Sequence, residues 1–455
     1  MSTPGTAALT RLADLVGAEH FWTDPTGLSR YVVDGRWPRA AVQPGSAEEV
    51  AEVVRLARAE KLALVPVGGG TRLGLGMPPS RYDVAVDCSR LNRIIAYDPG
   101  DLTLGVEAGM RVAALDAVLA RHGQMLPLEM PFFDAMTIGG MLASGSSGPQ
   151  RQLYGAPRDF LLGAEFVTGE GRRAKSGGRV VKNVTGYDFH RLLIGSLGTL
   201  AIFTVANFRT FPRPPAQALF VISFAELGGA LALRRALAQS PLTPTAIELA
   251  SPALVRLLGP DAALVPPGHW SVWVLAGGES TVVERHARDL ERMARSASRT
   301  AFARLDAESM NPLWTRLREF PSLAREASPA PTLVKCNMLP GELGTLAAHA
   351  ENIAGRHRLP CALLLRGVGI LYVLLLPEET GEETLARLAA AAEELLQTGT
   401  EYGSAVVEAC PVELKRMVHV WGSAARRNDL ELMRRLKQVF DPDHVLSPGR
   451  HIGGL

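Results

Sequence analysis

Cysteine is scarce in this sequence, and the few cysteines are not clustered. Cys88, Cys336, Cys361 and Cys410 lie far apart in the 455-residue chain, and no C-x-x-C pair occurs. Structural zinc sites and iron–sulfur clusters need thiolates at short, regular spacing. We therefore expect free thiols, no metal site and no iron–sulfur relay within this chain.

Long apolar runs and an excess of one charge are also missing. No stretch of about 18 apolar residues occurs, so no membrane-spanning helix is predicted. The 48 basic and 46 acidic residues give a net charge of +2 without a long basic run, which argues against a nucleic-acid ligand. Residues 1–8 lack the charged start and apolar centre of a signal peptide. We expect a cytoplasmic protein that meets a membrane only through partners.

Glycine, in contrast, is concentrated in a few places. An apolar run over residues 62–67 predicts a buried strand, which enters a loop with five glycines within residues 68–76. Glycine reaches positive φ without steric cost and lets a backbone come close to a ligand. Consecutive amides in such a loop form a concave anion site, so a phosphate or pyrophosphate is the expected ligand. A flexible surface turn is the alternative.

Two well-known phosphate-binding loops do not fit this stretch. Thr71 and Arg72 do not supply the Gly-Lys-Ser/Thr ending of a P-loop. The dinucleotide fingerprint G-x-G-x-x-G opens a helix, whereas here Met77 and two prolines lead to another strand-like run at residues 83–87. The glycine loop is therefore predicted to join one strand to another.

Two more segments rich in small residues follow, at residues 137–149 and 177–188. The first has so few large side chains that we expect a loop that either lies in solvent or presses its backbone against something flat or charged. Three such loops set between strands are explained more simply by one extended ligand with several contact sites than by three independent turns.

A proline-rich segment at residues 212–215 indicates a stiff linker. Beyond it, helical and strand-like runs alternate, and Gly367-Val368-Gly369 predicts a tight hairpin. This pattern is typical of an α+β domain with an antiparallel sheet. The predicted strands are residues 219–224, 271–275, 333–338, 361–366, 370–376 and 404–410, and the predicted helices are residues 228–239, 281–297 and 382–397.

Several of these motifs occur in an order that resembles a known family. They are residues 66–71, 137–140, 154–159, 182–188, 195–200 and 447–450. Together they resemble the FAD-binding flavoproteins of vanillyl-alcohol oxidase type, with a PCMH-type FAD-binding domain, and within them the FAD-binding subunits of bacterial glycolate oxidase. The resemblance implies an α+β fold with a two-part FAD-binding domain at residues 1–215, a substrate or cap domain with an antiparallel sheet at 216–424, and a return to the FAD domain at 425–455.

The resemblance also implies roles for individual residues. The first glycine loop would wrap the FAD pyrophosphate, because backbone amides are fixed donors for an anion. The second segment would line the pyrophosphate and flavin ring, and the third would close over the adenosine and the ring edge. The implied cofactor-binding residues are Pro66, Gly68, Gly69, Gly70, Thr71, Pro131, Thr137, Gly139, Gly140, Ser144, Gly148, Asn183, Val184, Gly186, Tyr187 and Asp188.

The sequence departs from the catalytic relatives of this family. Their histidine motifs, which resemble H-x-G-D-G-N and E-H-G and hold a metal and a base, are absent. Oxidation of a 2-hydroxy acid needs a base, a cation for the carboxylate and a hydride acceptor. The candidate base is His419. The candidate cation for the carboxylate is Arg366, Lys335 or Arg450. Arg450 is also expected to place positive charge near the flavin.

The departure favours an FAD-binding component of a multi-subunit 2-hydroxy-acid dehydrogenase of the glycolate oxidase type. A homologous flavin subunit would do the chemistry, and an iron–sulfur subunit would accept the electrons. The alternatives are a self-sufficient FAD-dependent dehydrogenase of another hydroxy acid or alcohol, a non-catalytic flavin-bearing scaffold, and a flavin-free phosphate-binding module.

Overall fold

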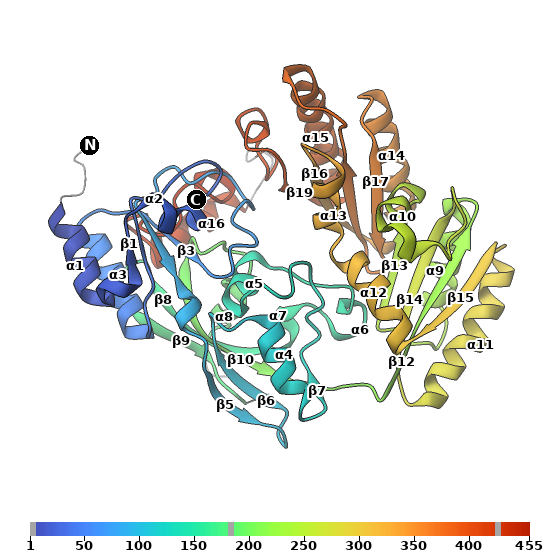
Figure 1. The fold of residues 1–455 in the computed structure, drawn as a ribbon, viewed down its shortest axis with the longest axis horizontal. Coiled ribbons are helices and arrows are strands. Elements are labelled where there is room, and N and C mark those ends of the chain that lie inside the picture. Colours follow the sequence, from blue (N-terminus) through green and yellow to red (C-terminus); the bar gives the residue numbers. More distant parts are fainter. Residues whose placement is uncertain (1–5, 181–185, 424–428) are drawn as a thin grey trace.

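The computed structural model describes residues 6–180, 186–423 and 429–455. It has two parts that lie side by side in Figure 1, an N-terminal part in blue and green and a second part in yellow and orange. Each part has its own sheets and its own buried apolar clusters. The first part carries the glycine-rich segments, and we call the second part the cap.

The first part contains two main sheets. In the smaller sheet, of order β1-β2-β4-β3, β4 pairs in parallel with both β2 and β3. The larger sheet, of order β5-β6-β10-β8-β9, is antiparallel throughout. The strands are β1 (Phe21–Trp22), β2 (Ala40–Val42), β3 (Leu64–Val67), β4 (Val84–Asp87), β5 (Ile94–Asp98), β6 (Thr103–Glu107), β8 (Leu161–Thr168), β9 (Arg173–Gly177) and β10 (Ala201–Arg209), with a small ribbon of β7 (Gln124–Met125) and β11 (Phe211–Pro212).

Helices cover these sheets. Ser46 caps α3 by accepting a hydrogen bond from the Glu49 amide, and the apolar side of α3 is buried against β3 and β4. The helices of this part are α1 (Thr6–Val16), α2 (Pro25–Leu28), α3 (Ala47–Ala59), α4 (Val112–Ala120), α5 (Ile138–Ser144), α6 (Arg151–Tyr154), α7 (Pro157–Phe160) and α8 (Phe189–Leu192).

The expectation of a loop over residues 137–149 was wrong for its first half, because Ile138–Ser144 forms helix α5. Thr137 caps this helix by accepting from the Gly140 amide, and Gly145 ends it in the left-handed region at φ 63°. Ile138, Met141 and Leu142 are buried in the core of the first part. The small residues between them leave the opposite side of the helix open to a close neighbour.

The cap is one eight-stranded sheet of order β15-β12-β14-β13-β17-β18-β16-β19, and every pair in it is antiparallel. This confirms the predicted antiparallel α+β architecture, including the hairpin at Gly367–Gly369 between β17 and β18. The strands are β12 (Ala216–Phe224), β13 (Ala246–Ala250), β14 (Trp270–Gly278), β15 (Ala301–Asp306), β16 (Thr332–Met338), β17 (Cys361–Arg366), β18 (Ile370–Leu375) and β19 (Gly403–Ala409).

Helices pack on both faces of the cap sheet. One face is covered by α9 (Leu227–Ala238), α11 (Ser280–Ser296), α14 (Leu343–Arg356) and α15 (Glu382–Tyr402). The other face packs against α10 (Pro252–Leu258), α12 (Ala307–Arg318) and α13 (Phe320–Ala327), and it also carries charged side chains that reach the first part.

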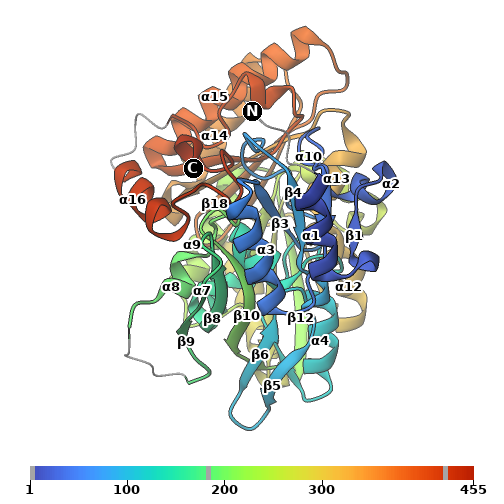
Figure 2. The same ribbon diagram turned by 90° about the vertical axis from the view of Figure 1, so that its left-hand side faces the viewer.

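The chain then returns from the cap to the first part. Helix α16 (Leu430–Phe440) lies beside the N-terminal elements in both views (Figures 1 and 2). Leu446 forms a parallel bridge with Leu64 of β3, and Lys437 donates to the Thr199 carbonyl at 2.7 Å. The last residues therefore lie beside the strand that enters the glycine loop. Among the helices described, none is both long and apolar enough to cross a bilayer.

Candidate functional site

The first glycine loop and helix α5 face one another across a narrow groove. Two contiguous cavities of about 60 and 50 Å³ share Pro66, Gly68, Thr137, Gly140 and Ala143 as lining residues. We call them together the glycine groove. Its further lining residues are Val67, Gly69, Gly70, Thr71, Arg72, Leu73, Cys88, Ala108, Met136, Gly139, Ser144, Leu197, Gly198, Ala201, Ile202, Phe203 and Arg450.

Two glycines are needed here because the backbones approach closely. A Cβ on Gly68 would lie 2.1 Å from Thr137 Oγ1, and a Cβ on Gly69 would lie 1.7 Å from the Ala135 carbonyl oxygen. Gly70 has a φ of 73°, which a side chain disfavours. The spacing between the loop and the start of α5 thus depends on the absence of side chains.

The amides of this loop suit an anionic ligand. Within the described chain, the N–H groups of residues 68–71 donate no hydrogen bond to a protein acceptor. Gly69 and Gly70 are exposed and Gly68 and Thr71 are half-buried, so these amides are accessible to a ligand, and several of them together in one turn form a nest for an anion such as a pyrophosphate. The residues present therefore fit a dinucleotide cofactor with its pyrophosphate at this loop.

Two buried cations hold the second half of the loop in place. Arg450 Nη2 donates to the carbonyls of Leu73 and Leu75 at 2.5 and 2.6 Å, and Lys415 Nζ donates to those of Gly74 and Gly76 at 2.6 and 2.9 Å. Along residues 73–76, the backbone carbonyls therefore accept hydrogen bonds alternately from Arg450 and from Lys415. Both cations come from the chain after the last cap strand, Lys415 from the 3-10 turn Leu414–Arg416 and Arg450 from the C-terminal tail.

The charges of these two cations are balanced differently. Lys415 forms an ion pair with both oxygens of Asp34, at 2.9 and 2.8 Å. Arg450 forms no ion pair with a carboxylate of the described residues, its Nε is buried without a partner, and burial lowers its pKa. Since Arg450 lines the glycine groove, it supplies positive charge there that the nearby charge of Asp34 offsets without an ion pair.

A second cavity of about 280 Å³ continues from the groove, with Thr71 and Arg72 lining both. We call it the cation pocket. It lies between the loop, the segment at Phe132, helix α13 and the end of β19, and its other lining residues are Gly74, Leu75, Pro321, Ala324, Arg325, Pro329, Pro331, Thr332, Leu333, Glu408, Ala409, Cys410 and Pro411.

Glu408 of β19 joins the glycine loop to the cap at this pocket. One of its oxygens lies 3.1 Å from Lys335 Nζ, and the other accepts from Arg72 Nη1 at 3.2 Å. Burial alone would raise the pKa of Glu408, but Lys335 and Arg72 outweigh burial and hold it at about 2. The carboxylate therefore stays ionised at any ordinary pH. The sequence marked Lys335 as a candidate cation, but it gave no reason to single out Glu408, which is 73 residues away.

Arg366 forms a second link between the cap and the first part. It is buried, lies 3.2 Å from Glu248 Oε1, and donates from Nη1 to the Ser147 carbonyl at 2.9 Å. Its guanidinium also lies over the Tyr372 ring, 5.1 Å from the centroid. Burial raises the pKa of Glu248, while Arg366 opposes that shift. Arg366 thus fixes the cap against the segment after α5, and it lines neither the groove nor the cation pocket.

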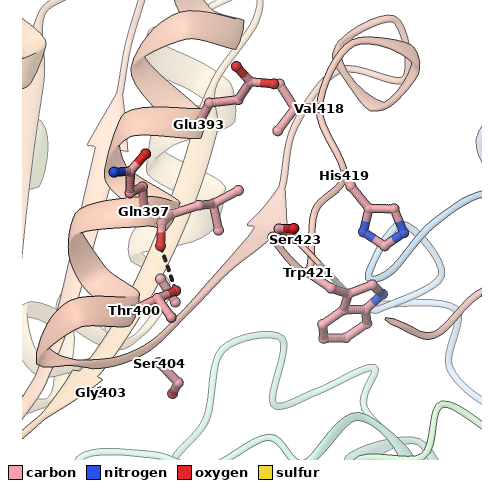
Figure 3. A pocket seen from close by; sticks show the side chains of 12 residues that line it. Glu393, Gln397, Thr400, Gly403, Ser404, Val418, His419, Trp421 and Ser423 are labelled. Atoms are coloured by element: carbon pink, nitrogen blue, oxygen red, sulfur yellow. Dashed lines mark hydrogen bonds between the residues drawn. The ribbon is translucent and has the colours of Figure 1, made fainter. Parts of the chain in front are cut away.

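His419 lies in a different cavity, of about 360 Å³. Figure 3 shows it with Trp421 on the segment that leaves the cap, across from Gln397 and Thr400 of α15. Partial burial lowers its pKa. The structure does not bring His419 and Arg366 together. Trp421 is the connection to the groove region, because its indole donates to the Arg450 carbonyl at 3.0 Å.

The predicted cofactor residues fall into three sets. The structure brings those of the first loop and of α5 together at the glycine groove, as described above. Pro131 and Gly148 are buried outside the groove, with a Cβ on Gly148 only 1.9 Å from the Glu129 carbonyl. Gly186, Tyr187 and Asp188 are exposed near β9, where Ser176 Oγ donates to the Tyr187 carbonyl, and Asn183 and Val184 lie outside the described residues.

Comparison with known proteins agrees with this arrangement. Residues 38–177 match the FAD binding domain family, and residues 213–406 and 417–451 match the C-terminal domain of FAD linked oxidases, which is half of the chain. The chain is similar to glycolate oxidase subunit GlcD of Bacillus subtilis (strain 168), with 23% identity over 97% of this chain and 95% of that protein.

Two further likenesses support the assignment. Glycolate oxidase subunit GlcE of Escherichia coli (strain K12) is 40% identical over 36% of this chain and 47% of that protein, so the match spans about half of GlcE. The crystal structure of p-cresol methylhydroxylase with substrate bound has the same fold, with a TM-score of 0.77 and 18% identity over 98% of this chain and 96% of that one. The chain therefore belongs to the FAD-linked oxidases and is an FAD-binding oxidoreductase with a PCMH-type FAD domain and a cap.

Proposed function

We propose that this chain is the FAD-bearing subunit of a 2-hydroxy-acid dehydrogenase complex of the glycolate oxidase kind. The observation that carries the proposal is that the cation pocket and the glycine groove share Thr71 and Arg72. Guanidinium groups bind carboxylates through charge-assisted hydrogen bonds. A 2-hydroxy acid held by its carboxylate in this pocket would have its reacting carbon beside the cofactor groove.

The residues then have distinct tasks. When bound, FAD would supply the hydride acceptor for oxidation of a 2-hydroxy acid to a 2-oxo acid, and a base outside the cation pocket would take the hydroxyl proton. The amides of residues 68–71 and the small residues of α5 would hold the cofactor. Arg450 would place positive charge beside it, and Arg72 would orient the substrate carboxylate.

The proton acceptor is the step that supports a multi-subunit arrangement. Among the residues that line the cation pocket, Glu408 is the only carboxylate, and no histidine is present. A base with a pKa of about 2 accepts a proton poorly at neutral pH. We therefore infer that a homologous flavin subunit supplies the proton acceptor that the cation pocket lacks, and that an iron–sulfur partner receives the electrons. The likeness to GlcD and GlcE, which are named as glycolate oxidase subunits, is consistent with such a complex.

The test is anaerobic titration of the flavin absorbance with glycolate and with D-lactate. It is done on the chain purified alone and on the chain with whatever proteins co-purify. Bleaching of the flavin only in the presence of partners supports the proposal. Bleaching by the isolated chain supports a self-sufficient dehydrogenase. If no 2-hydroxy acid perturbs or bleaches the flavin in either preparation, the substrate class is wrong.

A scaffold role makes a different prediction. If the flavin of this chain only stabilises the complex, Arg72→Gln and Arg450→Gln should leave turnover of the complex unchanged while the flavin content stays normal. Our proposal predicts a loss of turnover in Arg72→Gln with the flavin content retained, because Arg72 lies where the two cavities meet.

A further inference from the structure

A cavity of about 280 Å³ lies between the first part and the cap, apart from the glycine groove and the cation pocket. It adjoins the linker that crosses from the first part to β12 in Figure 1, and we call it the linker cavity. Its lining includes Asp116, Glu129 and Gln150 of the first part, Arg213 of the linker and Arg318 of α12. It shares no lining residue with the groove or the cation pocket, so the proposed oxidation gives it no task.

Both arginines of the linker cavity already have a carboxylate partner. Arg213 Nη2 donates to Asp116 Oδ1 at 2.5 Å, and Arg318 Nε lies 3.3 Å from Glu319 Oε1. The Arg318 guanidinium also lies over the Phe133 ring, 4.9 Å from the centroid. Each of the two ion pairs is neutral as a unit, so neither arginine brings an unbalanced positive charge to the cavity.

Glu129 is the carboxylate that has no cation in direct contact. It is half-buried, its Oε2 accepts a hydrogen bond from the Trp314 indole at 2.9 Å, and no basic group of the described residues lies within ion-pair distance of it. Burial raises the pKa of Glu129, and the Trp314 hydrogen bond and the more distant charge of Arg318 oppose this rise. A ligand that placed a cation against this carboxylate would stabilise its ionised form.

Gln150 adds a second acceptor to the same cavity. The residue is 3% exposed, and its Oε1 is buried without a hydrogen-bond partner among the described residues. Its segment is held beside Glu129, because Gly148 packs so closely that a Cβ there would lie 1.9 Å from the Glu129 carbonyl oxygen. A buried acceptor of this kind needs a donor that the described protein does not supply.

The two acceptors together define the polar end of a ligand. Gln150 Oε1 needs an N–H or O–H donor, and Glu129 needs a donor that carries positive charge. A primary ammonium group has three N–H donors and one positive charge, so it can donate to both. A bare metal ion fits less well, because the described residues contain no group of three or more acidic, histidine or cysteine side chains that could hold one.

The remaining walls define the rest of the ligand. They are largely apolar and include Met125, Leu126, Leu128 and Phe133. The volume has room for roughly nine water molecules at about 30 Å³ each. The cavity therefore suits a small molecule with one polar end and a compact apolar body.

From these observations we propose that the linker cavity binds a small organic cation, a primary amine with an apolar body of about eight carbon atoms or fewer. The ammonium group donates to the Glu129 carboxylate and to Gln150 Oε1, and the apolar body lies against Leu126 and Phe133. Because the cavity is lined from both parts, the bound amine stabilises the seating of the cap on the first part. This inference is independent of the proposed function, since it concerns a separate site.

The test compares two probes of the same shape, 2-phenylethylamine and 2-phenylethanol, which differ only in an ammonium group against a hydroxyl group. Their dissociation constants are measured by isothermal titration calorimetry on the FAD-loaded protein at neutral pH. We expect the amine to bind at least about tenfold more tightly, because charge-assisted hydrogen bonds to Glu129 are gained. The amine should also raise the melting temperature of the protein more than the alcohol does at equal concentration.

Variants assign the difference to the two acceptors. Glu129→Gln keeps an acceptor for Trp314 but removes the charge, so the affinities of the two probes should become nearly equal. Gln150→Met has a similar volume without the amide oxygen, and it should weaken binding of the amine several-fold more than binding of the alcohol. Glu431→Gln is the matched control, because Glu431 is an exposed glutamate of α16 outside the cavity, and its ratio should equal that of the parent.

Trp314 reports where the amine binds. Addition of the amine should change the tryptophan fluorescence of the parent, because the Trp314 indole donates to Glu129. This change should be lost in Trp314→Phe, while the calorimeter still detects binding. A fluorescence change that persists in Trp314→Phe would place the amine elsewhere and overturn the assignment.

The outcomes bear on this inference alone. If the two probes bind the parent with equal affinity, or if Glu129→Gln and Gln150→Met both leave their ratio unchanged, the cation site is wrong. If neither probe binds at millimolar concentration, the linker cavity is not an amine site and the inference is overturned. The flavin titration with 2-hydroxy acids tests the proposed function separately, so the two can fail independently.

Discussion

Replacing Lys415 by methionine tests how the cap and the cofactor loop are held together. Lys415 Nζ has four oxygen neighbours within 2.9 Å, two on Asp34 and the carbonyls of Gly74 and Gly76, and the side chain is almost fully buried. Methionine fills a similar volume but donates no hydrogen bond. The change therefore leaves the largely buried Asp34 carboxylate without its cation and leaves two carbonyls of the loop unpaired.

The size of the effect follows from that uncompensated charge. Removal of one partner of a buried ion pair costs about 3 to 5 kcal/mol in unfolding free energy. At about 2 to 4 °C per kcal/mol, this corresponds to a fall of roughly 6 to 20 °C in melting temperature. Because Lys415 holds every second carbonyl of residues 73–76, we also expect weaker FAD binding, measured by the return of flavin fluorescence on dilution.

A double variant separates the lost charge from lost packing. In Lys415→Met with Asp34→Asn, the buried carboxylate becomes neutral, so we expect about half or more of the stability to return. Lys175→Met is the matched surface control, since Lys175 is mostly exposed and 4.0 Å from Glu165, and it should change stability by less than about 0.5 kcal/mol. A loss below about 1 kcal/mol in Lys415→Met, or no recovery in the double variant, would refute this account.

Three other variants test the groove and the links between the parts. Gly69→Ala should abolish FAD retention, because a Cβ there would lie 1.7 Å from a backbone oxygen, whereas Gly228→Ala, where nothing lies within 4 Å, should bind FAD normally. The pKa of Glu408 is lowered to about 2 in the folded protein, so its carboxylate contributes stability above its ordinary pKa of about 4.3, and this stability is lost as the pH falls toward 2. Urea titrations from pH 6 to pH 3 should therefore show a smaller fall in unfolding free energy for Glu408→Gln than for the parent. Equal falls in the two proteins would contradict this. Arg366→Met should lower the melting temperature, because it leaves Glu248 buried without its cation. The double variant Arg366→Met with Glu248→Gln should recover part of the lost melting temperature. If Arg366→Met alone is as stable as the parent, this link between the parts is dispensable.

The sequence was informative wherever a local pattern determines the structure. The strand that enters the first glycine loop, the hairpin between β17 and β18 and six strands of the cap sheet were predicted from apolar runs and turn residues. Strands β13 and β15 were missed. Ala246–Ala250 is short, and β15, which pairs only with β12 and has half-exposed side chains, lacks a clear apolar signal. Helix α5 was missed because its glycines and serine suggest a loop unless the cap at Thr137 is given weight.

Of the candidate site, only the glycine groove, which is formed largely by backbone, could be predicted from the sequence. A cluster of glycines indicates that the backbone lies close to a ligand or to another segment, so the glycine residues of the groove could be identified from the sequence. The cation pocket, in contrast, depends on Arg72, Arg325, Lys335 and Glu408, each of which is an ordinary charged residue in its own segment. Only the register of β16 against β19, together with the seating of the cap on the first part, brings them to one place. The spacing of these four residues along the sequence does not predict that they lie close together.

The same geometry links cofactor binding to the position of the cap. Arg72 and the carbonyls of residues 73–76 belong to the cofactor loop, while Glu408 and Lys415 belong to the cap strand and the segment that follows it. A ligand that binds only the ordered loop stabilises every contact that orders it, by an amount set by its concentration relative to its dissociation constant. FAD should therefore protect the amides of β19 from hydrogen exchange, although β19 does not line the groove, and this protection should be lost in Lys415→Met. Equal exchange at β19 with and without FAD would show that the cap and the cofactor loop are thermodynamically independent.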